Sequence, residues 1–205
     1  AEYMLLSQRT TEVGMEFALN YSFNGWQILT LLMPNMFGNP AHGNYWGYAN
    51  FWEEAVYIGL PAVIIGFFWL ISLRRKENRA LRIVLILGSL LTIILAMGRF
   101  TQVFPWLYEH IPTFDLFQAP ARMNIWLVFA LALTAGLGFE RWRRPEGKAL
   151  YWSRLAVAGG VGVLLVGLFG GAALPAELAE LPLGETFFPS VIQLGVLIIL
   201  LSVLN

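Results

Sequence analysis

LRIVLILGSLLTIILAM, which runs from Leu81 to Met97, decides the fold class of this chain. Arg82 is the only charged residue in the stretch, and most of the others are apolar. A helix of about 20 mostly apolar residues crosses the hydrocarbon core of a bilayer, and tilting or local thinning absorbs a few ångströms of mismatch. The stretch therefore predicts a membrane-spanning helix.

Four further stretches of the 205 residues have a similar character. We expect spans at Ala55 to Leu73, Asn124 to Phe139, Leu155 to Leu174 and Pro189 to Leu204. The whole chain is 58% hydrophobic and 13% charged, whereas a soluble domain carries about 25% charged residues. The predicted fold class is all-α, a polytopic transmembrane helix bundle with about five spanning helices. Because no signal-peptide pattern follows Ala1 and an apolar run ends the chain, we interpret it as an internal fragment.

Lysine and arginine, which are retained on the cytoplasmic side, orient the expected spans. They cluster in two connections, at Arg74, Arg75, Lys76, Arg79 and Arg82, and at Arg141, Arg143, Arg144, Lys148 and Arg154. We therefore expect a multi-pass plasma-membrane protein with loops 1–54, 98–121 and 175–188 on the extracytoplasmic side. Residues 1–54 form an extracytoplasmic segment, and residues 55–205 form the transmembrane bundle.

Composition also excludes several classes of function. The formal net charge is zero, which argues against a nucleic-acid partner, because such proteins need a basic excess. No cysteine is present, so disulfides, thiolate zinc sites and cysteine nucleophiles are excluded. No H-E-x-x-H or G-x-S-x-G motif occurs, and no cofactor or metal site is evident. Asp115 either pairs with a nearby arginine or helps to hold a divalent cation.

Two local patterns predict packing. Ser22 is in a position to cap a helix that runs through Leu32 and lies along the membrane surface. Glycines are frequent between Ala158 and Ala173, and Gly167 and Gly171 form a G-x-x-x-G pair that favours close helix packing in lipid. No phosphate-binding lysine or strand accompanies these glycines, so packing is favoured over a nucleotide loop.

Glu53 and Tyr57 are the first candidate ligand-binding residues. On one helix they are four residues apart and share a face, so a carboxylate and a phenol would meet the same polar ligand. The alternative is that Glu53 and Glu54 sit at a helix N-terminus, where the dipole favours anions.

Arg122 and Arg99 are the second candidate pair. Pro120 favours the first turn of a helix, which places Arg122 near free backbone N–H groups and makes it suitable for a phosphate. The alternative is an arginine that reaches the lipid headgroups. Arg99 ends a span on the same side, and together the two arginines favour an anionic ligand or lipid headgroup.

Several motifs together resemble the YfhO family of bacterial membrane proteins, which look like sugar transferases of the GT-C fold. The matching stretches are Leu31 to Pro40, Tyr45-Trp46-Gly47, Phe51-Trp52-Glu53 with Tyr57 and Gly59, Gly98-Arg99-Phe100, Ile111-Pro112 with Phe114 and Phe117, Ala119-Pro120-Ala121-Arg122, Phe129 to Ala132, and Ala135 to Gly138. The resemblance covers roughly Ser7 to Arg141. One departure is Gln118, where the family more often has an arginine, so a phosphate site here would be differently arranged.

The resemblance implies transfer of a sugar from a polyprenyl-phosphate donor to an extracytoplasmic acceptor. Arg122, with Arg99 secondary, would then contact phosphate, while Glu53 and Tyr57 would orient hydroxyl groups. It also implies that the main catalytic carboxylate lies upstream of Ala1. The alternatives are a lipid or polysaccharide transporter or flippase, and a non-catalytic membrane scaffold. The expected partners are the membrane, lipid headgroups and the lipid-linked sugar.

Overall fold

The computed structural model describes residues 14–71, 79–142, 148–178 and 180–203, and the regular secondary structure in these ranges is helical. The predicted all-α class is therefore confirmed for this part of the chain. The longest helices are α4 (Leu60–Ile71), α5 (Arg79–Ala96), α7 (Asn124–Trp142), α8 (Lys148–Phe169) and α9 (Phe187–Val203).

Three helical stretches are long and apolar enough to cross a membrane, namely Arg79–Ala96, Pro120–Phe139 and Arg154–Ala173. They correspond to three of the five expected spans. The described parts of the other two expected spans are shorter, with 17 residues in α9 and 12 in α4, and both helices reach the end of a described range. At 1.5 Å per residue these parts measure about 26 Å and about 18 Å, compared with roughly 30 Å for a hydrocarbon core.

The expected start of the first span at Ala55 is wrong, because α4 begins at Leu60. Ala55 is extended, and Gly59 has a φ of 97°, a left-handed conformation that only glycine adopts without strain. Pro61 follows in the first turn of α4, where its missing N–H group costs no hydrogen bond. The apolar composition of residues 55–59 therefore does not indicate helix here.

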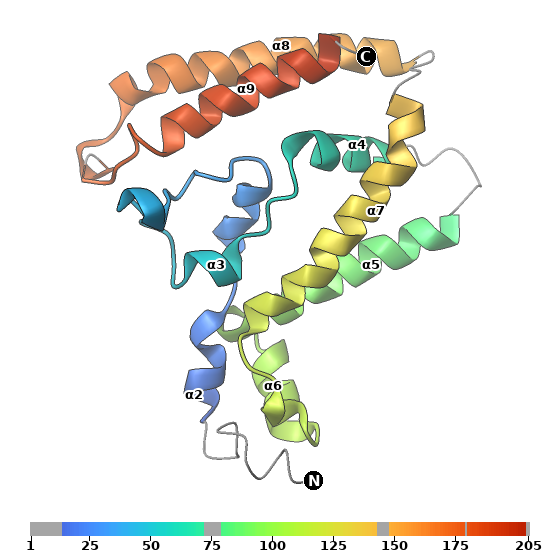
Figure 1. Ribbon diagram of the computed structural model, residues 1–205, viewed down its shortest axis with the longest axis vertical. Coiled ribbons are helices and arrows are strands. Elements are labelled where there is room, and N and C mark those ends of the chain that lie inside the picture. The colour runs from blue at the N-terminus through green and yellow to red at the C-terminus, as the bar shows by residue number, and fades with distance from the viewer. Residues whose placement is uncertain (1–13, 72–78, 143–147, 179, 204–205) are drawn as a thin grey trace.

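The long helices run in alternating directions between two ends of the molecule (Figure 1). Helices α4 and α5 pack on α7, and α8 and α9 form an antiparallel pair that contacts the other helices through α9 and α4. We define the rim as the end of this bundle at which α4, α7 and α9 begin and α5 and α8 end. The segment 14–59 lies at the rim (Figure 1).

Glycines bring α8 and α9 into backbone contact. A Cβ atom on Gly195 would lie 2.7 Å from the Leu164 nitrogen and 2.9 Å from the Gly160 carbonyl oxygen. A Cβ atom on Gly167 would likewise lie 2.9 Å from the Ile192 nitrogen, so the predicted role of the glycines in close packing is confirmed for Gly160 and Gly167. Gly171 of the G-x-x-x-G pair contributes less, because a Cβ atom there would meet only the Phe188 ring at 3.6 Å.

Short helices fill the rim. The first group comprises α2 (Met15–Ala18), η1 (Leu19–Tyr21), η2 (Gly25–Leu31), η3 (Pro40–His42) and α3 (Phe51–Glu54). The second comprises η4 (Gly98–Phe100), α6 (Val103–His110), η5 (Phe114–Leu116), η6 (Pro120–Met123), η7 (Gly170–Ala173) and η8 (Ala176–Leu178). A buried cluster of Phe23, Leu31, Val56, Ala96 and Ala121 joins the two groups to α5.

The predicted division of the chain into residues 1–54 and 55–205 stays a prediction.

Ser22 does not cap a helix as expected. Its hydroxyl donates to the Leu19 carbonyl at 2.6 Å and accepts from the Arg99 backbone N–H at 3.0 Å. The N-cap of η2 is Asn24, whose side chain accepts from the Trp26 N–H, while the Gln27 side chain accepts from the Asn24 N–H. The side chains of Asn24 and Gln27 therefore cap the start of η2. Ser22 instead links η1 to the turn that follows α5.

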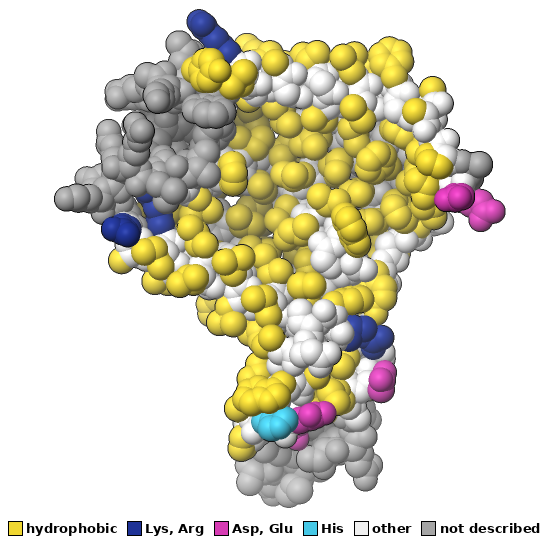
Figure 2. All heavy atoms as spheres, turned by 180° about the vertical axis from the view of Figure 1, so that it is seen from behind, with side chains coloured by type: hydrophobic (Ala, Val, Ile, Leu, Met, Phe, Trp, Pro, Cys, Tyr) yellow, Lys and Arg dark blue, Asp and Glu magenta, His cyan; other side chains and the backbone are white. Residues whose placement is uncertain are grey.

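Arg82, which we expected in a basic connection, lies in the first turn of α5 and is 2% exposed. Its guanidinium carbon is 4.8 Å from the centre of the Trp69 ring, which is cation–π distance. On the face shown in Figure 2, hydrophobic side chains cover most of the surface, and charged side chains lie toward its margins. This distribution is typical of contact with a lipid bilayer.

Candidate functional site

Arg122 and Glu53 form an ion pair with two hydrogen bonds at the rim. The Arg122 Nε donates to Oε2 of Glu53 at 2.9 Å, and its Nη2 donates to Oε1 at 2.7 Å. Asn50 caps the start of α3, which carries Glu53, and Pro120 occupies the first turn of η6, which carries Arg122. The structure thus brings two of the predicted site residues together. From the sequence, each was expected to bind a ligand, and their pairing with each other was not expected.

The ion pair leaves part of the arginine accessible. The Arg122 side chain is 58% exposed, and the Glu53 side chain is 21% exposed. Hydrogen bonds from Arg122 lower the pKa of Glu53 below its ordinary value, although partial burial opposes this. Since a guanidinium has five N–H donors and Glu53 accepts two, three remain for another acceptor.

Tyr57 does not share a helix face with Glu53, so this prediction is wrong. Helix α3 ends at Glu54, and the chain is extended at Ala55. The Tyr57 hydroxyl instead accepts from the Leu60 backbone N–H at 3.2 Å, at the start of α4. The phenol therefore satisfies an N-terminal helix donor, and its own hydroxyl hydrogen remains available.

A small cavity of about 200 Å³ lies beside α3. Phe51 and Ala55 line it, whereas Glu53 and Arg122 are not among its lining residues. Tyr57 also lines the cavity. The complete lining is Gln27, Thr30, Pro34, Asn35, Phe37, Gly38, Tyr45, Phe51, Ala55 and Tyr57. Of the predicted site residues, Tyr57 alone lines this cavity.

Arg99 follows α5 directly and is tied to the segment before η2. Its backbone N–H donates to Ser22 Oγ at 3.0 Å, and its side-chain Nε donates to the Leu19 carbonyl at 3.2 Å. Gly98 has a φ of 47°, and a Cβ atom there would collide with Ser22 Oγ and Pro120. The backbone thus makes a close turn that presents Arg99 at the surface.

The two arginines have different partners. Helix η1 contacts both η4 and η6, and the Ala119 N–H donates to the Ala18 carbonyl at 3.1 Å. Arg99 and Arg122 are therefore attached to the same short segment, but only Arg122 forms an ion pair among the described residues. Asp115 pairs with neither of them in the described part of the chain.

A groove of about 1040 Å³, which sequence reasoning missed, opens at the rim. Its walls come from two segments far apart in sequence, and Trp46 Nε1 joins them by donating to Thr186 Oγ1 at 3.0 Å. The lining is Asn24, Trp26, Gln27, Met36, Phe37, Trp46, Gly47, Tyr48, Leu174, Leu178, Leu181, Leu183 and Phe187. The only signal in the sequence was the group of aromatic residues, which a membrane belt explains equally well.

A side pocket of about 470 Å³ shares two lining residues, Asn24 and Trp26, with the groove. Its lining also includes Met97 and Phe100, which flank Gly98 and Arg99 in sequence. The complete lining is Asn24, Gly25, Trp26, Ile28, Leu29, Met97 and Phe100. Apolar surface therefore extends from the groove to the turn that carries Arg99.

Two other polar side chains at the rim, His110 and Asn124, differ in their hydrogen bonding. The His110 ring stacks on Trp106, and its Nδ1 lies 2.9 Å from the Trp106 carbonyl. Asn124 is 3% exposed, and within the described ranges neither amide atom has a hydrogen-bond partner. No group of three His, Asp or Glu side chains suited to a metal ion occurs among the residues that the structure describes.

Comparisons of the chain with protein-family models, with curated proteins and with solved structures gave no match.

Proposed function

We propose that the chain is part of a membrane protein that transfers a sugar from a polyprenyl-phosphate donor to an extracytoplasmic acceptor. The observation that carries this proposal is the groove of about 1040 Å³ at the rim, with its aromatic and aliphatic lining. A lipid-linked donor needs an apolar groove beside the membrane, so that its chain stays out of water. The resemblance to the YfhO family supports the same substrate class.

The chemistry of such a transfer divides among several groups. Positive charge stabilises the departing phosphate, and Arg99 and Arg122 supply it at the rim. Glu53 holds Arg122 in place, and Tyr57 retains a hydroxyl donor for a sugar or an acceptor. A general base must also activate the acceptor hydroxyl.

We also propose that α4, α5, α7, α8 and α9 form a five-span, GT-C-like bundle with the rim outside the plasma membrane. The alternating helix directions in Figure 1 support this threading. Local thinning of the bilayer and snorkelling of flanking side chains accommodate an apolar helix that is shorter than the hydrocarbon core. Loops 98–121 and 175–188, together with residues 1–54, are then extracytoplasmic.

The position of the groove favours surface chemistry over transport. Its lining comes from residues 24–48 and 174–187, and all of these lie outside the three span-length helices or at the start of α9. A transporter or flippase places its polar binding groups near the middle of the bilayer. A non-catalytic scaffold would have no use for a groove that takes a lipid chain.

The test measures sugar transfer by the full-length protein in lipid nanodiscs. Decaprenyl phosphate carrying a radiolabelled hexose serves as donor, and an extract of cell-envelope glycopolymers serves as acceptor. Leu178→Glu places a charge in the groove at a position that is already 40% exposed, so we expect a rate at least tenfold lower with little effect on folding.

Gly184→Glu is the matched control. It adds the same charge to the same loop, where a Cβ atom meets nothing within 4 Å, and should transfer sugar at the wild-type rate. Label that stays on the donor in the wild-type protein would contradict the proposal. So would movement of the intact donor between leaflets without transfer, which would establish the flippase alternative.

A further inference from the structure

We propose that Arg99 is the phosphate-binding residue of a lipid site whose apolar part is the side pocket and the groove. The ligand is an isoprenoid phosphate monoester, with its phosphate on the Arg99 guanidinium and its chain running past Trp26 into the groove. This inference rests on the proposed function. From the sequence, Arg122 was expected to be the main phosphate contact and Arg99 the secondary one, whereas here Arg99 is the main contact.

The Arg99 side chain is fixed at its base and open at its tip. Nε donates to the Leu19 carbonyl, and the backbone N–H donates to Ser22 Oγ. Among the described residues, the two terminal nitrogens of the guanidinium have no hydrogen-bond partner, and the residue is exposed. A guanidinium held in this way presents a preorganised pair of donors that matches two phosphate oxygens.

Arg122 is less suited to the same ligand. Its Nε and Nη2 form one edge of the guanidinium fork, and both donate to Glu53. The carboxylate also brings a negative charge next to any phosphate that binds there, which opposes binding. No described acidic residue forms an ion pair with Arg99.

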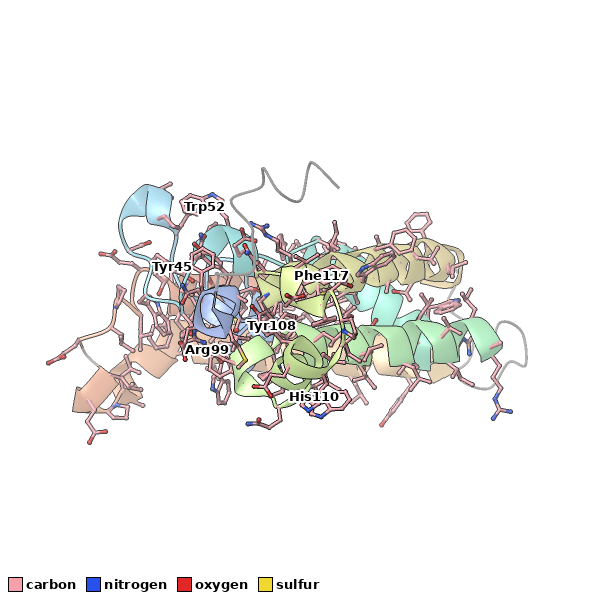
Figure 3. All side chains as sticks on the ribbon, turned by 90° about the horizontal axis from the view of Figure 1, so that it is seen from below. Tyr45, Trp52, Arg99, Tyr108, His110 and Phe117 are labelled. Carbon is pink, nitrogen blue, oxygen red and sulfur yellow. The ribbon has the colours of Figure 1, made fainter. Side chains whose placement is uncertain are left out.

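Aromatic residues connect the turn that carries Arg99 to the groove. Phe100, the next residue, lines the side pocket, and its ring lies 5.3 Å from the ring of Tyr48, which lines the groove. Trp26 lines both spaces and is 73% exposed. Arg99 lies beside α6 in Figure 3, and η4, which contains Arg99, contacts α6.

The combination of charge and apolar surface selects the class of ligand. A free phosphate gains nothing from a groove of about 1040 Å³, and a neutral lipid gains nothing from Arg99. An anionic head on a long hydrocarbon chain uses both, because burial of apolar area adds to the attraction between charges. An isoprenoid phosphate meets this requirement with a single head and a single chain.

The test measures binding of decaprenyl phosphate, which carries no sugar, to the full-length protein in phosphatidylcholine nanodiscs by native mass spectrometry. We expect Arg99→Gln to weaken binding at least tenfold, Arg122→Gln to weaken it less, and Arg99→Lys to restore part of the loss. Arg154→Gln, which removes the same charge at the opposite end of α8, is the control and should bind as the wild type does.

Competition identifies the ligand. Inorganic phosphate and phosphatidylglycerol should displace decaprenyl phosphate only at concentrations at least tenfold higher. Equal competition by phosphatidylglycerol would overturn the isoprenoid assignment in favour of a general headgroup site. A loss in Arg122→Gln larger than that in Arg99→Gln would overturn the assignment of Arg99.

Sugar transfer, measured separately, distinguishes this inference from the proposed function. If Arg99→Gln abolishes decaprenyl phosphate binding while the wild-type protein transfers no sugar, the lipid site stands and the transferase proposal fails. If the wild-type protein transfers sugar and Arg99→Gln both binds and transfers normally, the transferase proposal stands and the Arg99 site fails.

Discussion

Arg122 donates two hydrogen bonds to Glu53 across 69 residues of sequence, and this pair joins α3 to the turn that begins α7. Exposed ion pairs contribute little to stability, and the Arg122 side chain is 58% exposed. We therefore expect Glu53→Gln to lower the free energy of unfolding by about 1 kcal/mol or less. Thermal unfolding in detergent measures this, with the exposed Glu177→Gln as control. A loss of several kcal/mol would contradict the surface character of the pair.

The contribution of the pair should depend on pH in one direction. Arg122 lowers the pKa of Glu53 below 4.5 in the folded protein, so the unfolded chain binds more protons around that pH. The stabilisation is then fully present above pH 4.5 and is lost as the pH falls through the lowered pKa. The difference in unfolding free energy between wild type and Glu53→Gln should shrink on acidification. A difference that grows would contradict this sign.

Packing of α8 on α9 should not tolerate a side chain at Gly195. A Cβ atom there would lie within 3 Å of backbone atoms of Leu164 and Gly160, which cannot move without shifting a helix. We expect Gly195→Ala to lower the free energy of unfolding by about 1–3 kcal/mol. Gly162→Ala is the matched control, because nothing lies within 4 Å of its Cβ position, and it should be neutral or slightly stabilising. Equal effects of the two substitutions would mean that the helices do not pack as described.

Trp46→Phe tests the bond that joins the groove walls. The substitution keeps an aromatic ring next to Phe37 but removes the N–H group that donates to Thr186. We expect a loss of about 1 kcal/mol in unfolding free energy. We also expect decaprenyl phosphate to raise the melting temperature less than in the wild type, since the two walls are no longer joined. Unchanged ligand stabilisation would show that the bond is not needed for the groove.

The long helices could be predicted because hydropathy is a property of single segments. The expected spans from Leu81 and Asn124 match α5 and α7 closely, since a long apolar run has no stable alternative to helix in a membrane. The start of α4 was misplaced because residues 55–59 are equally apolar. Pro61 was the available signal, as proline favours the first turn of a helix.

The candidate site was harder to predict because it depends on contacts between distant segments. The sequence identified Glu53, Arg99 and Arg122 as unusual charges at one end of the spans, and the structure places all three at the rim. It gave no indication that Glu53 pairs with Arg122 or that Ser22 holds Arg99. The groove was not predictable at all, because Trp46 and Thr186 are 140 residues apart.

A lipid-linked donor and its acceptor can meet at the rim only if the rim faces the aqueous exterior. Because the chain has no cysteine, single cysteines report the side of the membrane without background from this chain. Gly184→Cys lies at the rim and Arg79→Cys at the opposite end, and both positions are exposed. In intact cells a membrane-impermeant maleimide should label Gly184→Cys, and it should label Arg79→Cys only after permeabilisation. The reverse pattern would place the groove and Arg99 on the cytoplasmic side and contradict the account.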